Sequence, residues 1–171
     1  MNLKSLELSE ITKKIDPIAA MRTTQWFLLT AEADGQVGTM TAAWGGLGNV
    51  WNKKTATVYV RPQRATKKQL DAAGRFTMTF FDGRLEEMTF LGRNSAADVP
   101  DKIEKSGLHL AKVDGLPTFE EGKIILVCKT LYKQAFDPEC FVEKGLVDAC
   151  YSAGDFSEMY IAEIEAAYEA E

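Results

Sequence analysis

Histidine and cysteine are scarce in this chain. It has one histidine, His109, and three cysteines, Cys128, Cys140 and Cys150, with no Cys-x-x-Cys spacing. These residues make no convincing zinc ligand set and no evident Cys–His pair, so we expect no metal site. We expect Cys128, which lies in an apolar run, to be a buried thiol, and His109 to face outward from a strand. A buried or inert thiol is the simpler interpretation of Cys140 and Cys150, with a reactive thiol as the alternative.

Long hydrophobic runs are missing as well. The most apolar stretches, residues 26–29 and 124–128, fall far short of the roughly 20 residues that a membrane-spanning helix needs. Residues 1–5 contain no apolar core of a signal peptide. We therefore expect a cytoplasmic protein that does not enter a membrane. The chain also lacks a Gly-x-Gly-x-x-Gly after a strand and a Walker loop, which argues against Rossmann and P-loop folds.

The chain has no excess of basic residues. It carries 20 Lys and Arg against 25 Asp and Glu, a formal net charge of -5. A nucleic-acid-binding surface needs a basic excess, so we do not expect nucleic acid as a partner. The 171 residues, of which 46% are hydrophobic and 26% charged, are typical of one soluble globular domain spanning residues 1–171.

Hydrophobic periodicity predicts a mainly β protein with short inserted helices. The expected strands are residues 26–31, 39–44, 55–60, 75–81, 123–134 and 159–164. We expect residues 75–81 to be half-buried and residues 123–134 to be the longest strand, buried on both faces. Asp34-Gly35 predicts a hairpin turn, whereas residues 112–119 are expected to form a loop or an irregular edge. Hairpin-connected strands favour an antiparallel barrel or an α+β sheet over a parallel doubly wound sheet.

Capping signals predict four helices between the strands. The expected helices are residues 67–73, capped by Thr66 and ended by Gly74; residues 85–91, ended by Gly92; residues 98–106, capped by Asp98; and residues 137–144.

Glycines and cations gather between residues 35 and 70. The first half of this stretch holds Thr39, Thr41 and Trp44 close to four glycines, at positions 38, 45, 46 and 48. Glycine lets backbone N–H groups approach a bound molecule closely. The second half places basic residues around the helix start at Thr66; these residues are Arg61, Arg64, Lys67 and Lys68. Free amides, a hydroxyl and cations at a helix start are suited to phosphate.

Each of these features also has a purely structural interpretation. Taken singly, the glycines of residues 45–48 are a loop, Trp44 and Trp51 are core aromatics, and the basic cluster is a solvated helix start. The combination of Arg64, Thr66 and Lys67 at one helix start favours the anion site.

Several motifs together resemble one known family. They are Thr-Met-Thr-Ala-Ala-Trp-Gly-Gly at residues 39–46, Val-Arg-Pro-Gln-Arg-Ala-Thr at 60–66, Leu-Gly-Arg-Asn-Ser at 91–95 with Asp98 and Lys102, Ser-Gly-Leu at 106–108, and Met-Tyr-Ile-Ala-Glu-Ile at 159–164. In this order they resemble the flavin reductase-like proteins with an FMN-binding split barrel, which include flavoredoxin. The resemblance covers nearly the whole chain.

The resemblance implies a six-stranded antiparallel Greek-key split barrel that binds FMN. By position it implies that Thr39, Met40, Thr41, Ala42, Ala43 and Trp44 line the flavin ring and ribityl chain, that Arg61, Arg64, Thr66 and Lys67 surround the phosphate, and that Gly92, Asn94 and Ser95 form the far wall. It also implies a homodimer with flavin near the interface. Reducing equivalents would pass from NAD(P)H or a redox partner protein through the bound FMN, and no catalytic side chain is assigned.

This sequence departs from the family pattern at several positions. Members often carry Asn at the position of Gly38, Ser at Ala43, Tyr at Ala65, and Tyr-His at Phe156-Ser157. These departures leave two hypotheses open. One is a flavin reductase-like or flavoredoxin-like oxidoreductase, and the other is a non-enzymatic FMN-binding protein that serves storage, sensing or assembly.

Overall fold

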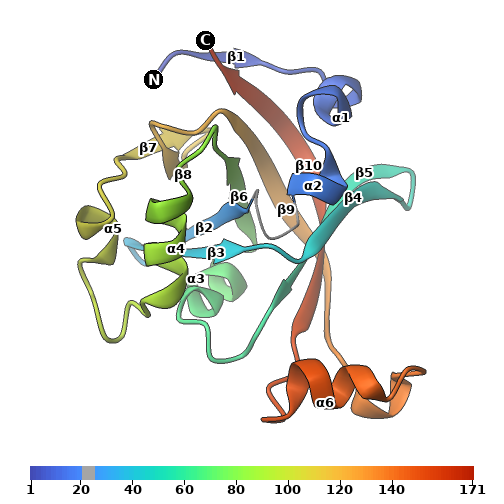
Figure 1. Cartoon of the computed structure of the whole chain (residues 1–171). Helices are drawn as coiled ribbons and strands as arrows, with labels where there is room; N and C mark the ends of the chain where they lie inside the picture. The colour runs from blue at the N-terminus through green and yellow to red at the C-terminus, as the bar shows by residue number, and fades with distance from the viewer. Residues whose placement is uncertain (21–25) are drawn as a thin grey trace.

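The computed structural model describes residues 1–20 and 26–171 (Figure 1). Its strands are β1 (Leu3–Ser5), β2 (Phe27–Ala33), β3 (Gln36–Ala42), β4 (Gly45–Val50), β5 (Lys53–Val60), β6 (Arg75–Phe80), β7 (Leu110–Val113), β8 (Leu116–Phe119), β9 (Ile124–Ala135) and β10 (Glu158–Ala170). Its helices are η1 (Leu8–Glu10), α1 (Ile11–Lys14), α2 (Pro17–Ala20), α3 (Thr66–Ala73), α4 (Leu85–Arg93), α5 (Lys102–Lys105), η2 (Pro138–Cys140) and α6 (Gly145–Tyr151).

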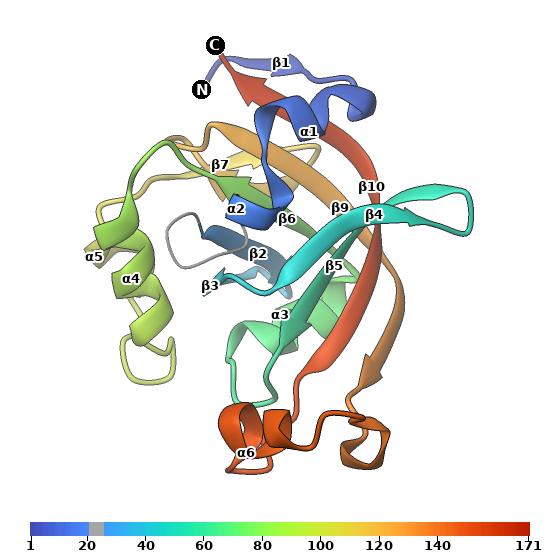
Figure 2. The ribbon, with the colours of Figure 1, turned by 45° about the vertical axis from the view of Figure 1, so that its right-hand side comes forward.

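The strands form one large antiparallel sheet that curls on itself. Its order is β3-β2-β6-β9-β10-β5-β4, with β1 added beside β10, and β7 and β8 form a separate hairpin. β3 and β5, near opposite ends of this order, lie close together, so the sheet bends into a barrel (Figures 1 and 2). The mainly β, antiparallel fold class is thereby confirmed. β1 and β4 extend the expected six strands to eight.

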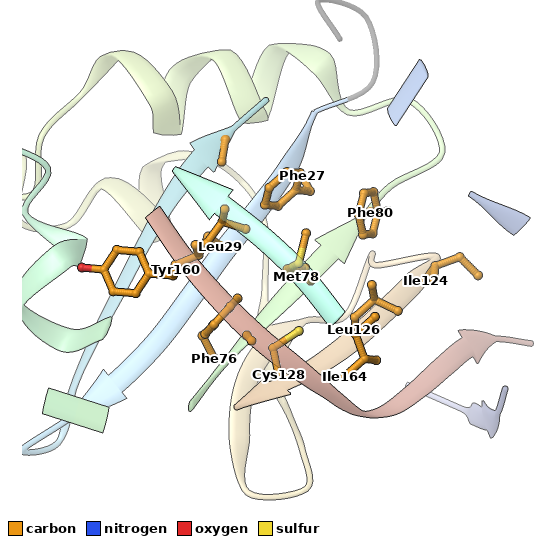
Figure 3. Packing of buried hydrophobic residues seen from close by; sticks show 14 of the residues in the cluster. Phe27, Leu29, Phe76, Met78, Phe80, Ile124, Leu126, Cys128, Tyr160 and Ile164 are labelled. Carbon is orange, nitrogen blue, oxygen red and sulfur yellow. The ribbon is translucent and has the colours of Figure 1, made fainter. Parts of the chain in front are cut away.

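The inward faces of these strands supply the main core. Figure 3 shows Phe27, Phe76, Met78, Leu126 and Tyr160 from the four strands β2, β6, β9 and β10 pointing into one cluster, and each side chain is fully buried. Because side chains alternate across a strand, the intervening residues face outward and need a second layer. α4 covers the outer face of β2, and the β7–β8 hairpin covers the outer face of β9. Cys128 lies in the main core, as expected, and burial raises the pKa of its thiol.

This second layer explains two differences from the expected strands. β6 is buried on both faces and not half-buried, because its outward-facing threonines contact β8. The Thr77 hydroxyl donates to Pro117 O, and the Thr79 hydroxyl forms a hydrogen bond with the Thr118 hydroxyl. β9 is buried on both faces over residues 124–128, as expected, but β10 is the longer strand.

Turn residues at positive φ connect the two strands of each of two hairpins. Asp34 and Gly35, with φ of 52° and 72°, join β2 to β3, as expected. Asp114 and Gly115, with φ of 51° and 78°, do the same for β7 and β8, so the expected loop at residues 112–119 is a hairpin. The Asp-Gly pair is itself a signal for such a turn.

The ends of the helices differ from the expected ones. Gly74 ends α3 with φ of 64°, as expected. Gly92 lies inside α4, which ends at Arg93, and α5 is a single turn that begins after Asp101 rather than at Asp98. Residues 137–144 contain only a short 3-10 turn, and α6 lies where no helix was expected.

Gly45, Gly46 and Gly48 form part of β4 rather than a loop. Trp44 and Trp51, which a structural interpretation placed in the core, are 46% and 55% exposed. Cys140 is exposed and Cys150 half-buried, so neither is a core thiol. His109 lies outside β7 and faces outward, as expected, beside Glu121. In the described part of the chain, no helix is long and apolar enough to cross a lipid bilayer.

Candidate functional site

Two adjoining cavities open beside the end of β3. The first, of about 440 Å³, contains the side chains of Trp26, Trp44 and Tyr59, and we name it the aromatic cavity. The second, of about 470 Å³, contains Arg93 and Lys102, and we name it the cationic cavity. Met40, Arg61, Arg64 and Arg93 line both cavities, which therefore adjoin one another, and we treat the two together as the candidate site.

Close packing of two helices on β3 shapes this space. A Cβ atom at Gly38 of β3 would lie 2.8 Å from Gln69 Oε1 and 3.2 Å from Thr66 Cα of α3. A Cβ atom at Gly92 of α4 would lie 3.0 Å from Thr41 Cβ of β3. Each glycine is therefore required for helix packing. By contrast, a Cβ atom at Gly46 or Gly48 would meet open space, so those positions show no close approach.

Arg64 is a half-buried cation at the junction of the two cavities. Its Nη1 donates to Gly92 O of α4 at 2.9 Å. Burial, followed by the neighbouring charge of Arg61, lowers the pKa of Arg64. No carboxylate of residues 1–20 or 26–171 forms an ion pair with Arg64. Its remaining guanidinium donors are therefore available to an anion in the cavity.

Lys102 adds a second, buried cation to the cationic cavity. Its side chain is 5% exposed, and its Nζ donates to Leu91 O and Asn94 O, each at 3.0 Å. Burial, and then the charge of Arg64, lower the pKa of Lys102 to about 8. An ammonium group has three donors, so two carbonyl partners leave one N–H for a further acceptor.

The start of α3 contributes neutral donors. The N-cap is Ala65 and not Thr66, and no side chain caps the helix, so the expected capping box with Gln69 is wrong. The amides of Lys67 and Lys68 already donate to Arg64 O and Ala65 O. Within the described ranges, the amides of Ala65 and Thr66 have no backbone acceptor. Both residues line the cationic cavity, so these amides and the Thr66 hydroxyl can bind an anion there.

Arg61 is occupied by other groups. Its Nη1 pairs with Asp155, its Nη2 donates to Cys150 O at 2.8 Å, and its guanidinium lies over the rings of Trp44 and Tyr151. Arg61 and Gln63 lower the pKa of Asp155. Arg61 therefore anchors the segment around α6 to the cavity wall and offers less to a ligand than Arg64 does.

Both cavities lack acidic side chains among the residues that the structure describes. The lining of the cationic cavity is rich in donors, and that of the aromatic cavity combines three aromatic rings with the apolar side chains of Met40, Met88, Ala42 and Ala43. Such a space suits a flat aromatic group linked to a compact anion.

Eleven of the thirteen residues expected at the site line this space. They are Met40, Thr41, Ala42, Ala43, Trp44, Arg61, Arg64, Thr66, Gly92, Asn94 and Ser95. Thr39 does not, because it is 1% exposed and its hydroxyl pairs with that of Thr30 at 2.9 Å. The Thr41 hydroxyl, although at the cavity, donates to Met88 O. Neither threonine hydroxyl is therefore free for a ligand.

Lys67 also lies outside the two cavities. Its Nζ forms ion pairs with Asp71 Oδ2 at 2.6 Å and Glu158 Oε2 at 2.7 Å. Burial opposes its charge, but these two carboxylates raise its pKa. The Tyr160 hydroxyl, which carries one proton, lies within hydrogen-bonding distance of the same two carboxylates. This network fastens α3 to β10, so Lys67 acts on the fold and not on the cavity.

Sequence reasoning did not assign several residues that line the cavities. They are Trp26, Tyr59, Gln63, Ala65, Met88, Thr89, Arg93, Ala96, Lys102 and Ser157. Arg93 and Lys102 lie within or beside a motif already singled out, and their charge was a usable signal. Ser157 reaches the site because β10 pairs with β5, with Glu158 opposite Val60, and no local pattern reveals that pairing.

Solved structures similar to this chain are flavin-binding proteins by name. An FMN-binding domain of a flavin reductase-like enzyme from Shewanella baltica has a TM-score of 0.70 at 20% identity, covering 98% of this chain and 77% of that one. Flavoredoxin from Methanosarcina acetivorans has a TM-score of 0.67 at 19% identity, covering 86% and 69%. An FMN-binding protein from Thermus thermophilus, with bound p-hydroxybenzaldehyde, has a TM-score of 0.65 at 19% identity, covering 85% and 71%.

Sequence comparisons give less information about this chain than the solved structures do. No family model matches the chain. An uncharacterized protein from Aeropyrum pernix is 30% identical over 138 residues, which are 75% of this chain. The chain spans about half (49%) of the length of that relative.

The buried position of Lys102 predicts an unusual titration. We expect its ammonium group to titrate near pH 8, because burial and Arg64 both disfavour its charge, whereas Lys67 titrates above its usual range because of its two carboxylate partners. NMR titration of isotopically labelled lysine side chains, assigned with Lys102→Arg and Lys67→Arg, measures both values. A Lys102 pKa at the ordinary value of 10.5 would contradict the buried, cation-facing geometry.

Proposed function

The chain has the flavin reductase-like split-barrel fold, and we propose that it binds one FMN across the two cavities. The phosphate would occupy the cationic cavity, and the flavin ring would lie in the aromatic cavity. The observation that carries this proposal is a set of buried or half-buried cations without acidic partners, directly beside an acid-free aromatic space.

The donor set fits a phosphate monoester. A phosphate of this kind carries a charge of about −1.5 to −2 at pH 7 and has three acceptor oxygens. Arg64 can offer a planar pair of donors, Lys102 a single N–H, and Ala65 and Thr66 their amides. Because Lys102 loses its proton as the pH rises through about 8, phosphate affinity should fall in that range. Among the described residues we identify one such subsite, which favours FMN over the diphosphate FAD.

The aromatic cavity suits the ring. Trp26, Trp44 and Tyr59 offer aromatic surface, and residues 40–44 line the cavity along the edge strand β3. A strand at the edge of a sheet has unpaired N–H and C=O groups on one side. These groups, and not the Thr39 and Thr41 hydroxyls, would bind the polar edge of the ring.

The proposed activity is that of a cytoplasmic flavin reductase-like or flavoredoxin-like oxidoreductase. FMN, when bound, would supply the redox chemistry, with reducing equivalents provided by NAD(P)H or a redox partner protein. The chain would hold the phosphate, orient the ring and surround it with neutral and cationic groups. An environment of this kind favours negative charge on a bound group.

Arg64→Ala tests the phosphate site. Losing a charge-assisted hydrogen bond costs about 1.5–3 kcal/mol, so FMN affinity should fall by about one to two powers of ten. Riboflavin, which lacks the phosphate, should bind the wild type and the variant about equally. Titration of both ligands into apo protein, followed by flavin fluorescence, measures these affinities.

Two further variants make the comparison specific. Arg75→Ala removes an arginine that pairs with Glu165 away from both cavities and should leave FMN affinity unchanged. Lys67→Ala should reduce FMN affinity far less than Arg64→Ala, because Lys67 lies outside the cavities. Unchanged FMN affinity in Arg64→Ala would place the phosphate elsewhere.

A non-enzymatic FMN-binding protein is the second candidate. It is favoured by the absence of any histidine or carboxylate among the described residues that line the cavities, with Ser157 at a position where many relatives of the family have histidine. We expect the FMN-loaded protein to oxidise NADH or NADPH in steady-state assays with free flavin, oxygen or a ferric complex as acceptor. Stable FMN binding without turnover with any of these acceptors would favour the second candidate.

We also propose that the protein is a homodimer. Exposed apolar side chains support this: Trp51 is 55% exposed, Val142 fully exposed and Leu146 49% exposed. A second copy that covers such groups would gain stability from burying apolar surface. Light scattering of the FMN-loaded protein should give about twice the mass of one chain, 18.9 kDa. A monomer that binds FMN with full stoichiometry would contradict this proposal.

A further inference from the structure

Arg61 and Arg64 lie at the two ends of one turn, but their side chains have different partners. The turn is closed by a hydrogen bond from Arg64 N to Arg61 O at 3.1 Å. Arg64 donates to Gly92 O of α4, whereas both terminal nitrogens of Arg61 bond to the chain between β9 and β10. This part of the chain, residues 136–157, contains α6 and lies at one end of the barrel (Figures 1 and 2). We name it the α6 segment.

The charge of Arg61 is balanced by the α6 segment. Its Nη1 pairs with Asp155, and its Nη2 donates to Cys150 O at 2.8 Å. Asp155 also accepts a hydrogen bond from Gln63 Nε2 at 2.7 Å. Arg64 has no such carboxylate partner among the described residues. A phosphate would therefore have to compete with Asp155 for Arg61, although Arg61 lines the cationic cavity.

The same guanidinium contacts two aromatic rings. Its Cζ lies 5.7 Å from the ring centroid of Trp44 and 5.2 Å from that of Tyr151. The two rings meet edge to face, with centroids 6.4 Å apart and planes at 78°. Both cation–ring distances are within the roughly 6 Å over which a cation attracts an aromatic face. Arg61 therefore holds the Trp44 ring beside the α6 segment.

Trp44 depends on such contacts for its orientation. It follows the end of β3, it is 46% exposed, and it lies outside the three buried clusters of the described chain. Tyr151, by contrast, is buried and stacks on Phe156 with centroids 5.1 Å apart, so it is a fixed support. An exposed side chain loses rotamer freedom when a ligand binds to it, and holding it in place beforehand lowers that cost.

We propose that Arg61 is a positioning residue for the flavin ring, which it serves by holding the Trp44 ring at the wall of the aromatic cavity, and that it does not bind the phosphate. This inference rests on the proposed binding of FMN across the two cavities. The resemblance to flavin reductase-like proteins implied that Arg61 lies at the phosphate, whereas its partners in this chain hold its guanidinium at Trp44. The α6 segment thereby takes part in ring binding through Asp155 and Tyr151, although these two residues line neither cavity.

Two flavins with the same ring test this assignment. In Arg61→Ala the affinities for FMN and for riboflavin, which lacks the phosphate, should both fall by about twofold to tenfold, up to the value of one cation–π contact. The ratio of the two affinities should stay as in the wild type. Arg64→Ala should lower this ratio, because it removes a phosphate donor only. Titration of both flavins into apo protein, followed by flavin fluorescence, measures these affinities.

A double-mutant cycle tests whether Arg61 acts through Trp44. Trp44→Ala should lower the riboflavin affinity, and adding Arg61→Ala should lower it by less than about a further twofold. The mobility of the Trp44 ring gives a second readout, which needs no ligand. In a variant with Trp26→Phe and Trp51→Phe, Trp44 is the only tryptophan, and Arg61→Ala should lower the fluorescence anisotropy of its indole.

Matched variants separate this effect from a loss of fold. Arg61→Gln keeps an amide that can donate to Asp155 but removes the cation from Trp44, so it should give the same results even if Arg61→Ala does not fold. Arg75→Ala removes an arginine that pairs with Glu165 outside both cavities, and it should change neither the flavin affinities nor the Trp44 anisotropy.

Several results would overturn the inference in distinguishable ways. Loss of FMN affinity alone in Arg61→Ala and Arg61→Gln would make Arg61 a phosphate ligand, and unchanged affinity for both flavins would leave it no role in binding. An equal loss for both flavins that persists in full in the Trp44→Ala background would show that Arg61 does not act through Trp44. If the wild type binds neither flavin, the proposed function fails and the role in ring binding fails with it, whereas unchanged Trp44 anisotropy in Arg61→Ala would refute the hold on Trp44 itself.

Discussion

The guanidinium of Arg64 joins the two helices that bound the candidate site, and it does so without a negative partner in the described chain. Its backbone leads into α3, and its side chain donates to Gly92 O of α4. Lys102 of α5 lines the same cavity and also bonds to carbonyl oxygens only. The charge of Arg64 lowers the pKa of Lys102, so the two cations repel each other. Keeping both charged in a partly buried space is costly unless an anion enters that space. The cationic cavity is most simply understood as a site whose anion comes from outside the chain.

The fold holds these cations in place through contacts far from the cavity. Gly38, on β3, allows α3 to lie against this strand, and Gly92, on α4, allows α4 to lie against the same strand. Lys67, Asp71, Glu158 and Tyr160 then join α3 to β10 by a partly exposed network of ion pairs and hydrogen bonds. Lys67, which its position in the sequence assigns to an anion site, thus serves to fix α3 to β10.

Much of the fold could be predicted because local patterns carry it. Strands β2, β5 and β9 follow apolar periodicity, and the Asp34-Gly35 turn follows backbone preference. The role of a side chain depends on which neighbour it meets, and local pattern does not contain that information. Thr39 and Lys67 are chemically suitable for a ligand, but their partners Thr30 and Glu158 occupy them. Lys102 and Ser157 lie at the site because of long-range packing, so their charge or polarity in the sequence could mark them only as candidates.

The account depends most on where the phosphate and the ring lie relative to Arg64. A crystal structure of the protein grown with FMN measures this directly. We predict a phosphate oxygen within hydrogen-bonding distance of the Arg64 guanidinium and of the Ala65 or Thr66 amide, with the flavin ring beside Trp44 and Tyr59. A phosphate bound away from Arg64 and Lys102, or a ring outside the aromatic cavity, would contradict the account.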